Sequence, residues 1–313
     1  MDQDLKRRTV RVQAVNITVN ALLAAFKLAA GLTARSSAMV SSAIENASDI
    51  FKDVMVFFSL RMSSKESDRD HPYGHERIES LTAVLLAVVL ALVGAGIGLN
   101  SIRLLASGVG GGLEPPGGLA LAAKSVGSRK RIRQYMGESA GAGIRVKELM
   151  FRYVRRGALA VRSDALMATA WDHRSDVLSS AGSFVGILGA RLGLPILDPL
   201  AGLIICLFIF RAAWDIFNSA MGKLVDRSCD PQTEADIRRA VLSEEGVLAL
   251  DEMRTRLFGP RIYVDIAIAC DGDLTLTQSH DIAERVHERV ERDFPDVKHC
   301  MVHVNPYLPP DVS

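Results

Sequence analysis

Long apolar runs recur along the first 217 residues of the chain. Residues 80–102 carry no charged side chain. As a helix rising about 1.5 Å per residue, they are long enough to cross a bilayer core of about 30 Å. Comparable runs occupy residues 12–32, 39–60, 173–194 and 197–217. Because soluble proteins rarely bury several such helices, the pattern predicts a polytopic α-helical membrane protein.

Lysine and arginine residues indicate how these helices are oriented. The N-terminal segment is basic and lacks the small-residue cleavage site of a signal peptide, so we expect it in the cytoplasm. The connection at 33–38 is short and carries only Arg35, as an external loop would, whereas residues 61–77 are long and basic enough for an internal one. The Gly- and Pro-rich residues 104–118 are then expected outside.

This topology demands a fourth crossing that the local composition does not favour. Residues 145–164 are strongly basic and are expected inside, so the chain must cross between about 104 and 150. A hydropathy scan rejects the polar segment 124–144. We keep a fourth span around 115–150, which makes a six-helix bundle. A surface insertion or a locally corrupted sequence at 124–144 would explain the mismatch equally well.

After Pro231 the pattern becomes that of a soluble domain. Helical periodicity at 233–246 is followed by two strand-like segments at 247–259 and 261–270, an amphipathic helix at 275–295 and a last strand at 297–306. The order predicts a small α+β domain at 226–313 behind a transmembrane domain at 1–225. A core of about 80 residues is near the lower limit of self-sufficiency, so we expect dimerisation to support it.

The composition argues against several classes of function. A formal net charge of +1 without a basic, aromatic surface argues against nucleic acid as a partner. The four cysteines, at 206, 229, 270 and 300, form no C-x-x-C pair, which argues against a disulfide framework or a zinc finger. The sequence holds no HExxH motif and no Ser/His/Asp set for a membrane hydrolase. We therefore expect neither an enzyme nor a prosthetic group.

Two pairs of acidic residues interrupt the apolar runs at helical spacing. Glu45 and Asp49 share one helical face, and Asp172 and Asp176 repeat the spacing on the fifth span. A carboxylate inside a bilayer is costly and usually marks an ion path. Four carboxylates meeting in one bundle would repel one another unless a divalent cation or protons lay between them. The sequence therefore predicts a metal site whose chemistry is metal–proton exchange.

The alternative to an ion site is structural, because an acid can pair with a nearby base such as Lys27, Lys52 or Arg174. Two acid pairs on separate spans favour the ion site. An all-oxygen ligand set favours Fe²⁺ or Mn²⁺ over Zn²⁺. His173 lies about 100° round the helix from the face of Asp172, so we expect it to support the site or line the pore.

Several motifs taken together resemble the cation diffusion facilitator family. They are "HPYGHERIES" at 71–80, the two acid pairs, "WDHRSDVLSS" at 171–180, "LVDR" at 224–227 and the terminal α+β domain. The resemblance covers nearly the whole chain except about 124–144. It implies a homodimeric metal–proton antiporter with six transmembrane helices and a cytoplasmic ferredoxin-like domain.

The resemblance also implies roles for particular residues. It places the transport site on the four acids, where the family commonly has Asp or His for Glu45 and often His for Asp172. Both departures are similar to the acid-rich branches of the family, which include magnetosome transporters. The other implied features are a loop metal site on Asp68, His71 and His75, a cytoplasmic-domain metal site on Asp251, His280 and His303, and an interlock of Arg77 with Asp226 between the two protomers.

Two of these features have an alternative interpretation from the residues themselves. The loop motif is an H-x-x-x-H that follows an acid, which is metal-ligand chemistry, but Pro72 and Gly74 would also shape a hydrated turn. In the cytoplasmic domain, Ala267 and Asn305 stand where the family has ligands, so that site is expected to be weak, altered or lost.

The sequence thus favours a proton-coupled exporter of divalent metal, Fe²⁺ or Mn²⁺ before Zn²⁺, that works by alternating access. We expect it in the lipid of the inner cell membrane with both termini cytoplasmic. The rival hypothesis is a membrane-anchored metal sensor or assembly scaffold that dimerises without transporting anything. The polar fourth span keeps this rival open.

Overall fold

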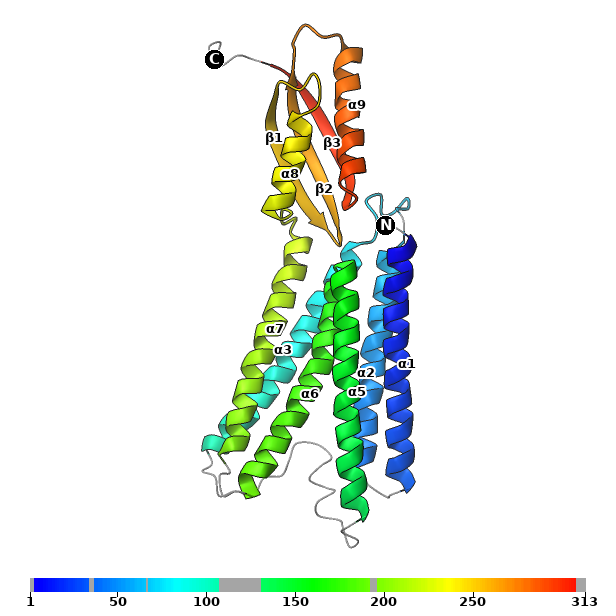
Figure 1. Ribbon diagram of the computed structural model, residues 1–313, viewed down its shortest axis with the longest axis vertical. Coiled ribbons are helices and arrows are strands. Elements are labelled where there is room, and N and C mark those ends of the chain that lie inside the picture. The colour runs from blue at the N-terminus through cyan, green and yellow to red at the C-terminus, as the bar shows by residue number, and fades with distance from the viewer. Residues whose placement is uncertain (1–2, 34–36, 66, 107–130, 192–195, 308–313) are drawn as a thin grey trace. The chain divides into compact units, whose positions relative to one another are not determined.

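The computed structural model describes residues 3–33, 37–65, 67–106, 131–191 and 196–307. The chain divides into two compact units, Met1–Ala220 and Met221–Ser313. Each unit has its own hydrophobic core. Long helices dominate the first unit, and two helices with a three-stranded sheet form the second (Figure 1).

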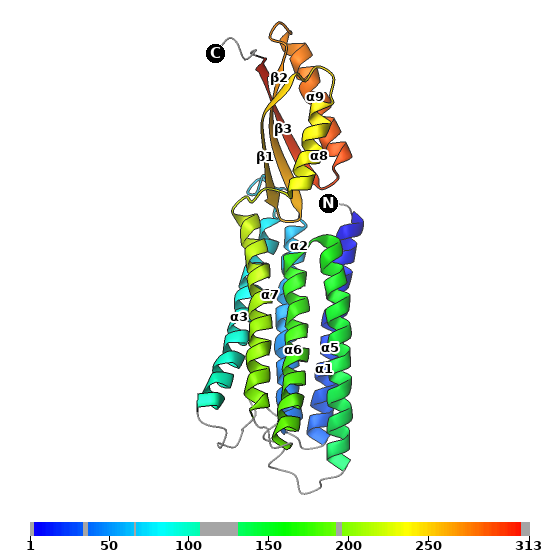
Figure 2. The same ribbon diagram turned by 60° about the vertical axis from the view of Figure 1, so that its left-hand side comes forward.

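Within the described residues, six long helices run through the first unit or end just beyond it (Figure 1). They are α1 (Gln3–Thr33), α2 (Ser37–Ser63), α3 (Arg77–Ala106), α5 (Arg131–Val161), α6 (Asp164–Arg191) and α7 (Leu197–Leu224). Helix α1 packs on α2 and α5, and α6 packs on α5 and α3 (Figure 2). The bundle therefore brings α2 and α6, the two acid-bearing helices, to the same interior.

Three of the described helices are long and apolar enough to cross a membrane: Thr9–Ala29 in α1, Arg77–Ala106 in α3 and Pro199–Leu224 in α7. Large apolar side chains are exposed on these helices, such as Leu92, which is 67% exposed, and Leu207, which is 70% exposed. An exposed apolar surface of this kind is typical of contact with lipid. The predicted multi-pass membrane protein is confirmed.

Close helix contacts in the bundle depend on residues without a side chain. A Cβ added at Gly98 of α3 would lie 2.6 Å from the Sγ atom of Cys206 on α7. A Cβ added at Gly157 of α5 would lie 2.8 Å from a methyl carbon of Val12 on α1. Small residues at such crossings let helix backbones approach closely inside a membrane.

The position of the fourth long helix differs from the sequence prediction. Helix α5 includes most of the basic residues 145–164, which were expected on the inside, and residues 107–130 lie outside the described chain. A helix of 31 residues is about 46 Å long, so one end extends past a bilayer core of about 30 Å. The exposed Arg152, Arg155 and Arg156 lie in the last turns of α5, where such an extension accommodates their charge.

A buried stripe explains why α5 lies in the bundle despite its polarity. Lys147, Met150, Val154 and Ala158 are spaced three and four apart, and all are buried. This spacing places them on one face of the helix. A hydropathy scan scores Lys147 as unfavourable in a membrane span, because it does not include partners on other helices. In the structure, the Lys147 ammonium group pairs with two carboxylates. The partners of Lys147 therefore compensate a charge that the local sequence leaves unexplained.

The second unit has the predicted order α-β-β-α-β. Its elements are α8 (Pro231–Leu242), β1 (Ala249–Phe258), β2 (Arg261–Cys270), α9 (Leu276–Asp293) and β3 (Val297–Pro306). The strand order is β1-β2-β3, with β1 antiparallel and β3 parallel to the central β2. Both helices pack on one face of the sheet (Figure 2). The predicted fold class, a helical membrane domain followed by a small α+β domain, is confirmed.

Side-chain caps fix where both helices of this unit begin. The carboxylate of Asp230 accepts a hydrogen bond from the backbone N–H of Thr233 at the start of α8. Thr275 and Gln278 form a reciprocal capping box at the start of α9. Caps of this kind satisfy N–H groups that have no partner within the helix. The capping box sets the residue at which α9 begins, and the helical repeat then determines the face on which each of its histidines lies.

Candidate metal centres

Three of the four predicted transport acids meet inside the membrane unit, and two lysines bridge them. The Lys52 Nζ atom lies 2.8 Å from Asp49 Oδ1 and 2.7 Å from Asp172 Oδ2. The Lys147 Nζ atom lies 2.8 Å from Asp49 Oδ2 and 2.8 Å from Asp176 Oδ2. We call these five residues the acid–lysine cluster. Glu45 lies in α2, but its side chain is outside the described part of the structure.

The pairing of acids with a base was the structural alternative to an ion site, and Lys52 was one of the bases considered. The structure places Lys52 between α2 and α6, where it contacts Asp49 and Asp172. Sequence reasoning missed Lys147, because residues 145–164 were interpreted only as a strongly basic segment on the inside. Its place on the buried stripe of α5 is the signal that could have revealed it.

The charges in the acid–lysine cluster are almost balanced without any metal. Three carboxylates face two ammonium groups, and the side chains of Asp49 and Lys147 are only 7% and 8% exposed. Buried charges persist only when they are paired and hydrogen-bonded. The ammonium groups occupy carboxylate oxygens that a cation would otherwise coordinate. A metal entering this cluster therefore has to displace them.

A further acid, which sequence reasoning missed, lies one turn beyond Asp49 along α2. Asp53 is buried, and its carboxylate accepts hydrogen bonds from the side-chain amides of Asn16 at 2.7 Å and Asn20 at 2.6 Å. The Gln13 amide donates to the backbone carbonyl of Asp53 at 2.8 Å. Gln13, Asn16 and Asn20, which we call the amide row, follow helical spacing along α1. Polar residues at this spacing within an apolar run indicate a buried polar face, and the sequence alone could have revealed it.

His173 belongs to this polar layer rather than to the acid–lysine cluster. It is 1% exposed, and its Nε2 atom lies 2.7 Å from the Asn16 side-chain oxygen. The expectation that His173 supports the site or lines the pore stays a prediction. Arg174, another base considered from sequence, pairs with Glu148 of α5.

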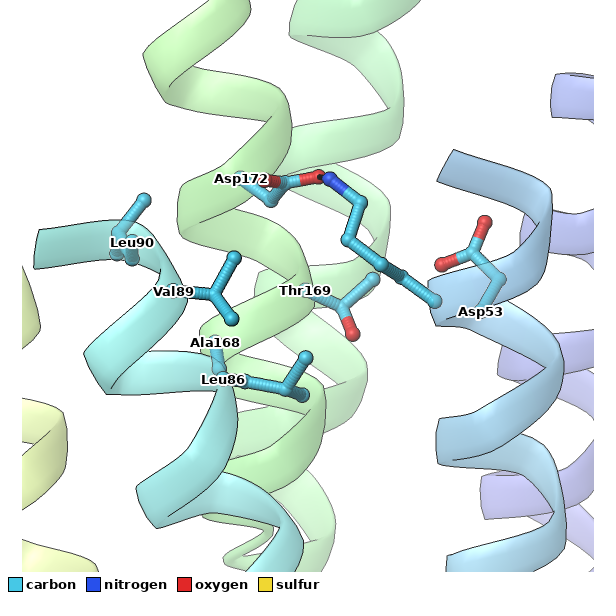
Figure 3. Close-up of a pocket in the computed structure, with 8 residues that line it drawn as sticks. Asp53, Leu86, Val89, Leu90, Ala168, Thr169 and Asp172 are labelled. Carbon is cyan, nitrogen blue, oxygen red and sulfur yellow. Dashed lines mark hydrogen bonds and ion pairs between the residues drawn. The ribbon is translucent and has the colours of Figure 1, made fainter. Parts of the chain in front are cut away.

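A small cavity connects the acid–lysine cluster with Asp53. Its volume is about 20 Å³, which suits a single water molecule. Lys52, Asp53, Thr169 and Asp172 supply its polar lining, and the apolar remainder is Leu86, Val89, Leu90 and Ala168. Figure 3 shows Asp53 and Asp172 on opposite sides of this space, on α2 and α6. Among the residues that line the cavity, the polar neighbours of the transport acid Asp172 are therefore Lys52, Asp53 and Thr169.

The predicted loop triad, Asp68, His71 and His75, comes together between α2 and α3. The ligand atoms of all three lie within 4.8 Å of one another. Asp68 Oδ1 lies 3.2 Å from His71 Nδ1, and Asp68 Oδ2 lies 3.5 Å from His75 Nε2. His75 is buried, whereas His71 is exposed. This geometry suits a metal ion that enters from solvent.

The electrostatics of the loop keep Asp68 ionised. Lys65 Nζ lies 2.5 Å from Asp68 Oδ2, and the backbone N–H of His71 donates to Asp68 Oδ1 at 2.8 Å. The hydrogen bond from Lys65, followed by that from the His71 backbone, lowers the pKa of Asp68 below its usual range. A carboxylate that is already deprotonated is ready to bind a cation.

The predicted ligands of the cytoplasmic domain form no such group within the described residues of one chain. Asp251 accepts a hydrogen bond from the Asn305 side chain at 2.8 Å. His303 lies opposite Ala267 in the β2–β3 pairing, and His280 is exposed on α9. A different set of residues comes together in this unit: His287, Glu291 and His299.

The predicted interlock concerns two copies of the chain. Arg77 is the first residue of α3. Asp226 follows α7 and has a left-handed backbone conformation, with a φ of 58°. The pairing of these residues between protomers stays a prediction.

Comparisons with known proteins identify the family. The family model for the cation efflux transmembrane domain matches residues 14–225, and the model for the cation efflux protein cytoplasmic domain matches residues 229–307. The chain belongs to the cation efflux family, also known as the cation diffusion facilitators. The resemblance drawn from the sequence motifs is confirmed.

Curated relatives share about a third of their residues with the chain over the aligned region. The manganese efflux system protein MneP of Bacillus subtilis is 30% identical over 169 residues, which are 52% of this chain and 57% of MneP. Metal tolerance protein C1 of Arabidopsis thaliana is 33% identical over 53% of this chain and 35% of its own length. The magnetosome protein MamB of Paramagnetospirillum magneticum is 29% identical over 51% of this chain and 54% of MamB.

Among solved structures, the C-terminal domain of MamM in a cadmium form is similar to the chain. It has 23% identity and a TM-score of 0.25, and the match covers 25% of this chain and 98% of that domain. A second MamM C-terminal domain structure has 25% identity and a TM-score of 0.24, over 24% of this chain and 96% of that domain.

Proposed function

We propose that this protein exports a divalent metal cation across a membrane in exchange for protons, by alternating access. Glu45, Asp49, Asp172 and Asp176 would form the transport site. The observation that carries the proposal is the meeting of Asp49, Asp172 and Asp176 inside a helix bundle of the cation efflux family. Intramembrane acids facing a bundle interior are typical of ion pathways.

The two lysines would act as tethered counter-cations of the empty site. Together, two ammonium groups carry the same charge as one divalent metal. A metal that enters would take over the carboxylate oxygens and release Lys52 and Lys147 from Asp49. Protons that arrive from the opposite side would then neutralise the carboxylates and weaken their hold on the metal. When the metal leaves and the protons dissociate, the ammonium groups would return.

The ligand set supports Fe²⁺ or Mn²⁺ as cargo before Zn²⁺. The candidate ligands are all carboxylate oxygens, and His173 contacts Asn16 instead of joining them. Carboxylate oxygens suit harder cations, whereas imidazole suits Zn²⁺. The name of MneP, a relative with 30% identity, refers to manganese efflux, which agrees with this preference.

Proteoliposomes that contain the purified protein provide the test. A proton gradient should drive uptake of Mn²⁺ or Fe²⁺ more strongly than uptake of Zn²⁺, and metal addition should release protons. Asp49→Asn should reduce uptake at least about tenfold, as expected for lost metal coordination. The matched control is Asp215→Asn, an acid on α7 whose side chain is 61% exposed. A preference for Zn²⁺ would contradict the ligand argument, and absence of flux with every metal would contradict transport.

A metal sensor or assembly scaffold is the second candidate function. The bridging of Asp49, Asp172 and Asp176 by lysine favours it, because such pairs hold helices together without metal. In that case Lys52 and Lys147 would lock the bundle permanently. The scaffold predicts no metal flux in wild-type protein and no flux in Lys147→Met. Flux in either protein would exclude it.

We further propose that the protein is a homodimer in the inner membrane, with both termini in the cytoplasm. The match of residues 229–307 to the family's cytoplasmic domain supports the placement of the C-terminus. Arg77 of one protomer would pair with Asp226 of the other. Arg77→Asp should weaken the dimer in detergent, and addition of Asp226→Arg should restore it. Light scattering would report the mass, and a double variant no better than the single one would contradict the interlock.

A further inference from the structure

The cytoplasmic unit contains a cluster of ligating side chains outside the positions predicted from sequence. His287 and Glu291 lie four residues apart on α9, and His299 lies near the start of β3. The His287 Nε2 atom is 3.4 Å from Glu291 Oε1, and the His299 Nδ1 atom is 3.3 Å from the same oxygen. We call these residues the cytoplasmic triad. Each offers a ligand atom within 4.8 Å of the others.

The backbone of Cys300 orients two members of the cytoplasmic triad. The Nδ1 atom of His287 lies 2.7 Å from the Cys300 carbonyl oxygen. A carbonyl can only accept, so Nδ1 carries the hydrogen and the Nε2 lone pair faces Glu291. The backbone N–H of Cys300 donates to Glu291 Oε1 at 3.1 Å. A histidine that donates one ring nitrogen to a carbonyl while the other faces the site is the usual arrangement of a metal-ligating imidazole.

This arrangement calls for a positive charge among the three residues. An imidazole lone pair that faces a carboxylate oxygen is repelled unless a proton or a metal ion lies between them. The neighbouring arginines of α9 are engaged elsewhere: Arg289 pairs with Glu244 at 3.0 Å and Arg292 with Asp293 at 3.0 Å. With these two arginines engaged, the histidines themselves or a bound cation can supply the balancing charge.

The nearby thiol of Cys300 is excluded as a further ligand. Cys300 is 1% exposed. It belongs to the hydrophobic core of the cytoplasmic unit and is not among the residues whose ligand atoms lie within 4.8 Å of one another. The donor set consists of two imidazole nitrogens and one carboxylate oxygen.

We propose that His287, Glu291 and His299 form a metal-binding site for Zn²⁺ or a similar borderline ion, with water as a further ligand. The side chains of the three residues are 29%, 34% and 49% exposed, so an ion and its water can reach them. Two histidines and one carboxylate with an open position suit Zn²⁺ better than Mn²⁺ or Fe²⁺. The cytoplasmic triad would thus respond to a metal different from the preferred cargo of the transport acids. Its existence does not depend on the protein being a transporter.

Zinc binding to the full-length protein in detergent tests this site. The background should carry Asp49→Asn and His71→Ala, so that the other two candidate centres do not obscure the result. Equilibrium dialysis against Zn²⁺ should show about one fewer bound ion per chain, or at least about tenfold weaker binding, for Glu291→Gln and His299→Ala. Visible absorption of bound Co²⁺ should weaken in the same variants.

The matched control is Glu288→Gln, which removes the charge of an exposed acid on the same helix outside the triad. It should bind Zn²⁺ like the background protein. Glu291→Gln keeps the size of the side chain, so a loss of metal in this variant is not a loss of fold. Unchanged Zn²⁺ binding in both Glu291→Gln and His299→Ala would overturn the proposal and leave the three residues as a simple histidine–carboxylate ion pair.

Discussion

Lys147 and Asp49 meet at 2.8 Å inside the bundle although 98 positions separate them in the sequence. Both side chains are almost fully buried, and each has a second partner of opposite charge. The contact ties α5, the least apolar of the long helices, to the acid-bearing face of α2. The lysine therefore contributes both to the stability of the bundle and to the electrostatics of the candidate transport site.

Lys147→Met is expected to have opposite effects on stability and on metal affinity. Loss of one partner of a buried ion pair typically costs about 3–5 kcal/mol, and here Asp49 keeps Lys52, so we expect about 3 kcal/mol. Because a metal would no longer displace the Lys147 ammonium group, Mn²⁺ should bind more tightly. Thermal unfolding in detergent and Mn²⁺ titration measure the two effects. Arg211→Met, at a side chain that is 80% exposed, should change neither.

Asp53→Ala should loosen the packing of α1 on α2. The substitution leaves the amide groups of Asn16 and Asn20 without their acceptor inside the bundle. A buried donor without a partner costs about 1–3 kcal/mol. A drop in unfolding temperature or faster proteolysis in detergent would report the loss. Thr18→Ala, which removes an exposed hydroxyl bonded within α1, should remain within about 0.5 kcal/mol of wild type. Equal stability of the two variants would contradict a structural role for the amide row.

Gly98→Ala and Gly96→Ala form a matched pair on α3. A methyl group at Gly98 would lie 2.6 Å from Cys206 Sγ, whereas one at Gly96 would meet nothing within 4 Å. Overpacking of this kind costs about 1–3 kcal/mol, so Gly98→Ala should lower the unfolding temperature. Gly96→Ala should be neutral or stabilising by up to about 1 kcal/mol, because alanine favours a helix. If both variants unfold alike, α3 and α7 do not approach each other as closely as the structure indicates.

Lys65→Ala should raise the pKa of Asp68 towards its usual value. The folded state holds this pKa low through Lys65 and the His71 backbone, so any stability from these contacts is present above the usual pKa of an aspartate. It is lost as the pH falls through the lowered pKa. An NMR titration of the labelled carboxyl carbon would measure the change, with Arg69→Ala as the control. An unchanged titration in Lys65→Ala would show that Lys65 does not set the charge of the loop triad.

The sequence predicted the general fold because its apolar runs and strand patterns are local. Helical spacing placed Asp172 and Asp176 on one face, and the structure brings both to lysines that also hold Asp49. The boundary of α5 could not be found in this way. A hydropathy scan sums the hydropathy of individual residues. It cannot include the carboxylates on other helices that pair with Lys147.

The polar contacts that sequence analysis missed have the same origin. Gln13, Asn16 and Asn20 showed helical spacing, but no single one of them carries a charge that would mark a site. Glu291 and His299 belong to different elements and meet only because β3 runs beside α9. Residue spacing within one element cannot reveal a site that the turn between two elements assembles.

The bridging of the acids by Lys52 and Lys147 also has an electrical consequence. If one divalent ion displaces both ammonium groups and they swing back toward the side from which the metal enters, their outward movement offsets the inward movement of the metal, and the binding step moves little net charge through the bilayer. Metal jumps on a solid-supported membrane should then give almost no transient current in wild-type protein. In Lys147→Met the same jump should give a distinct capacitive signal, since nothing counterbalances half of the incoming charge.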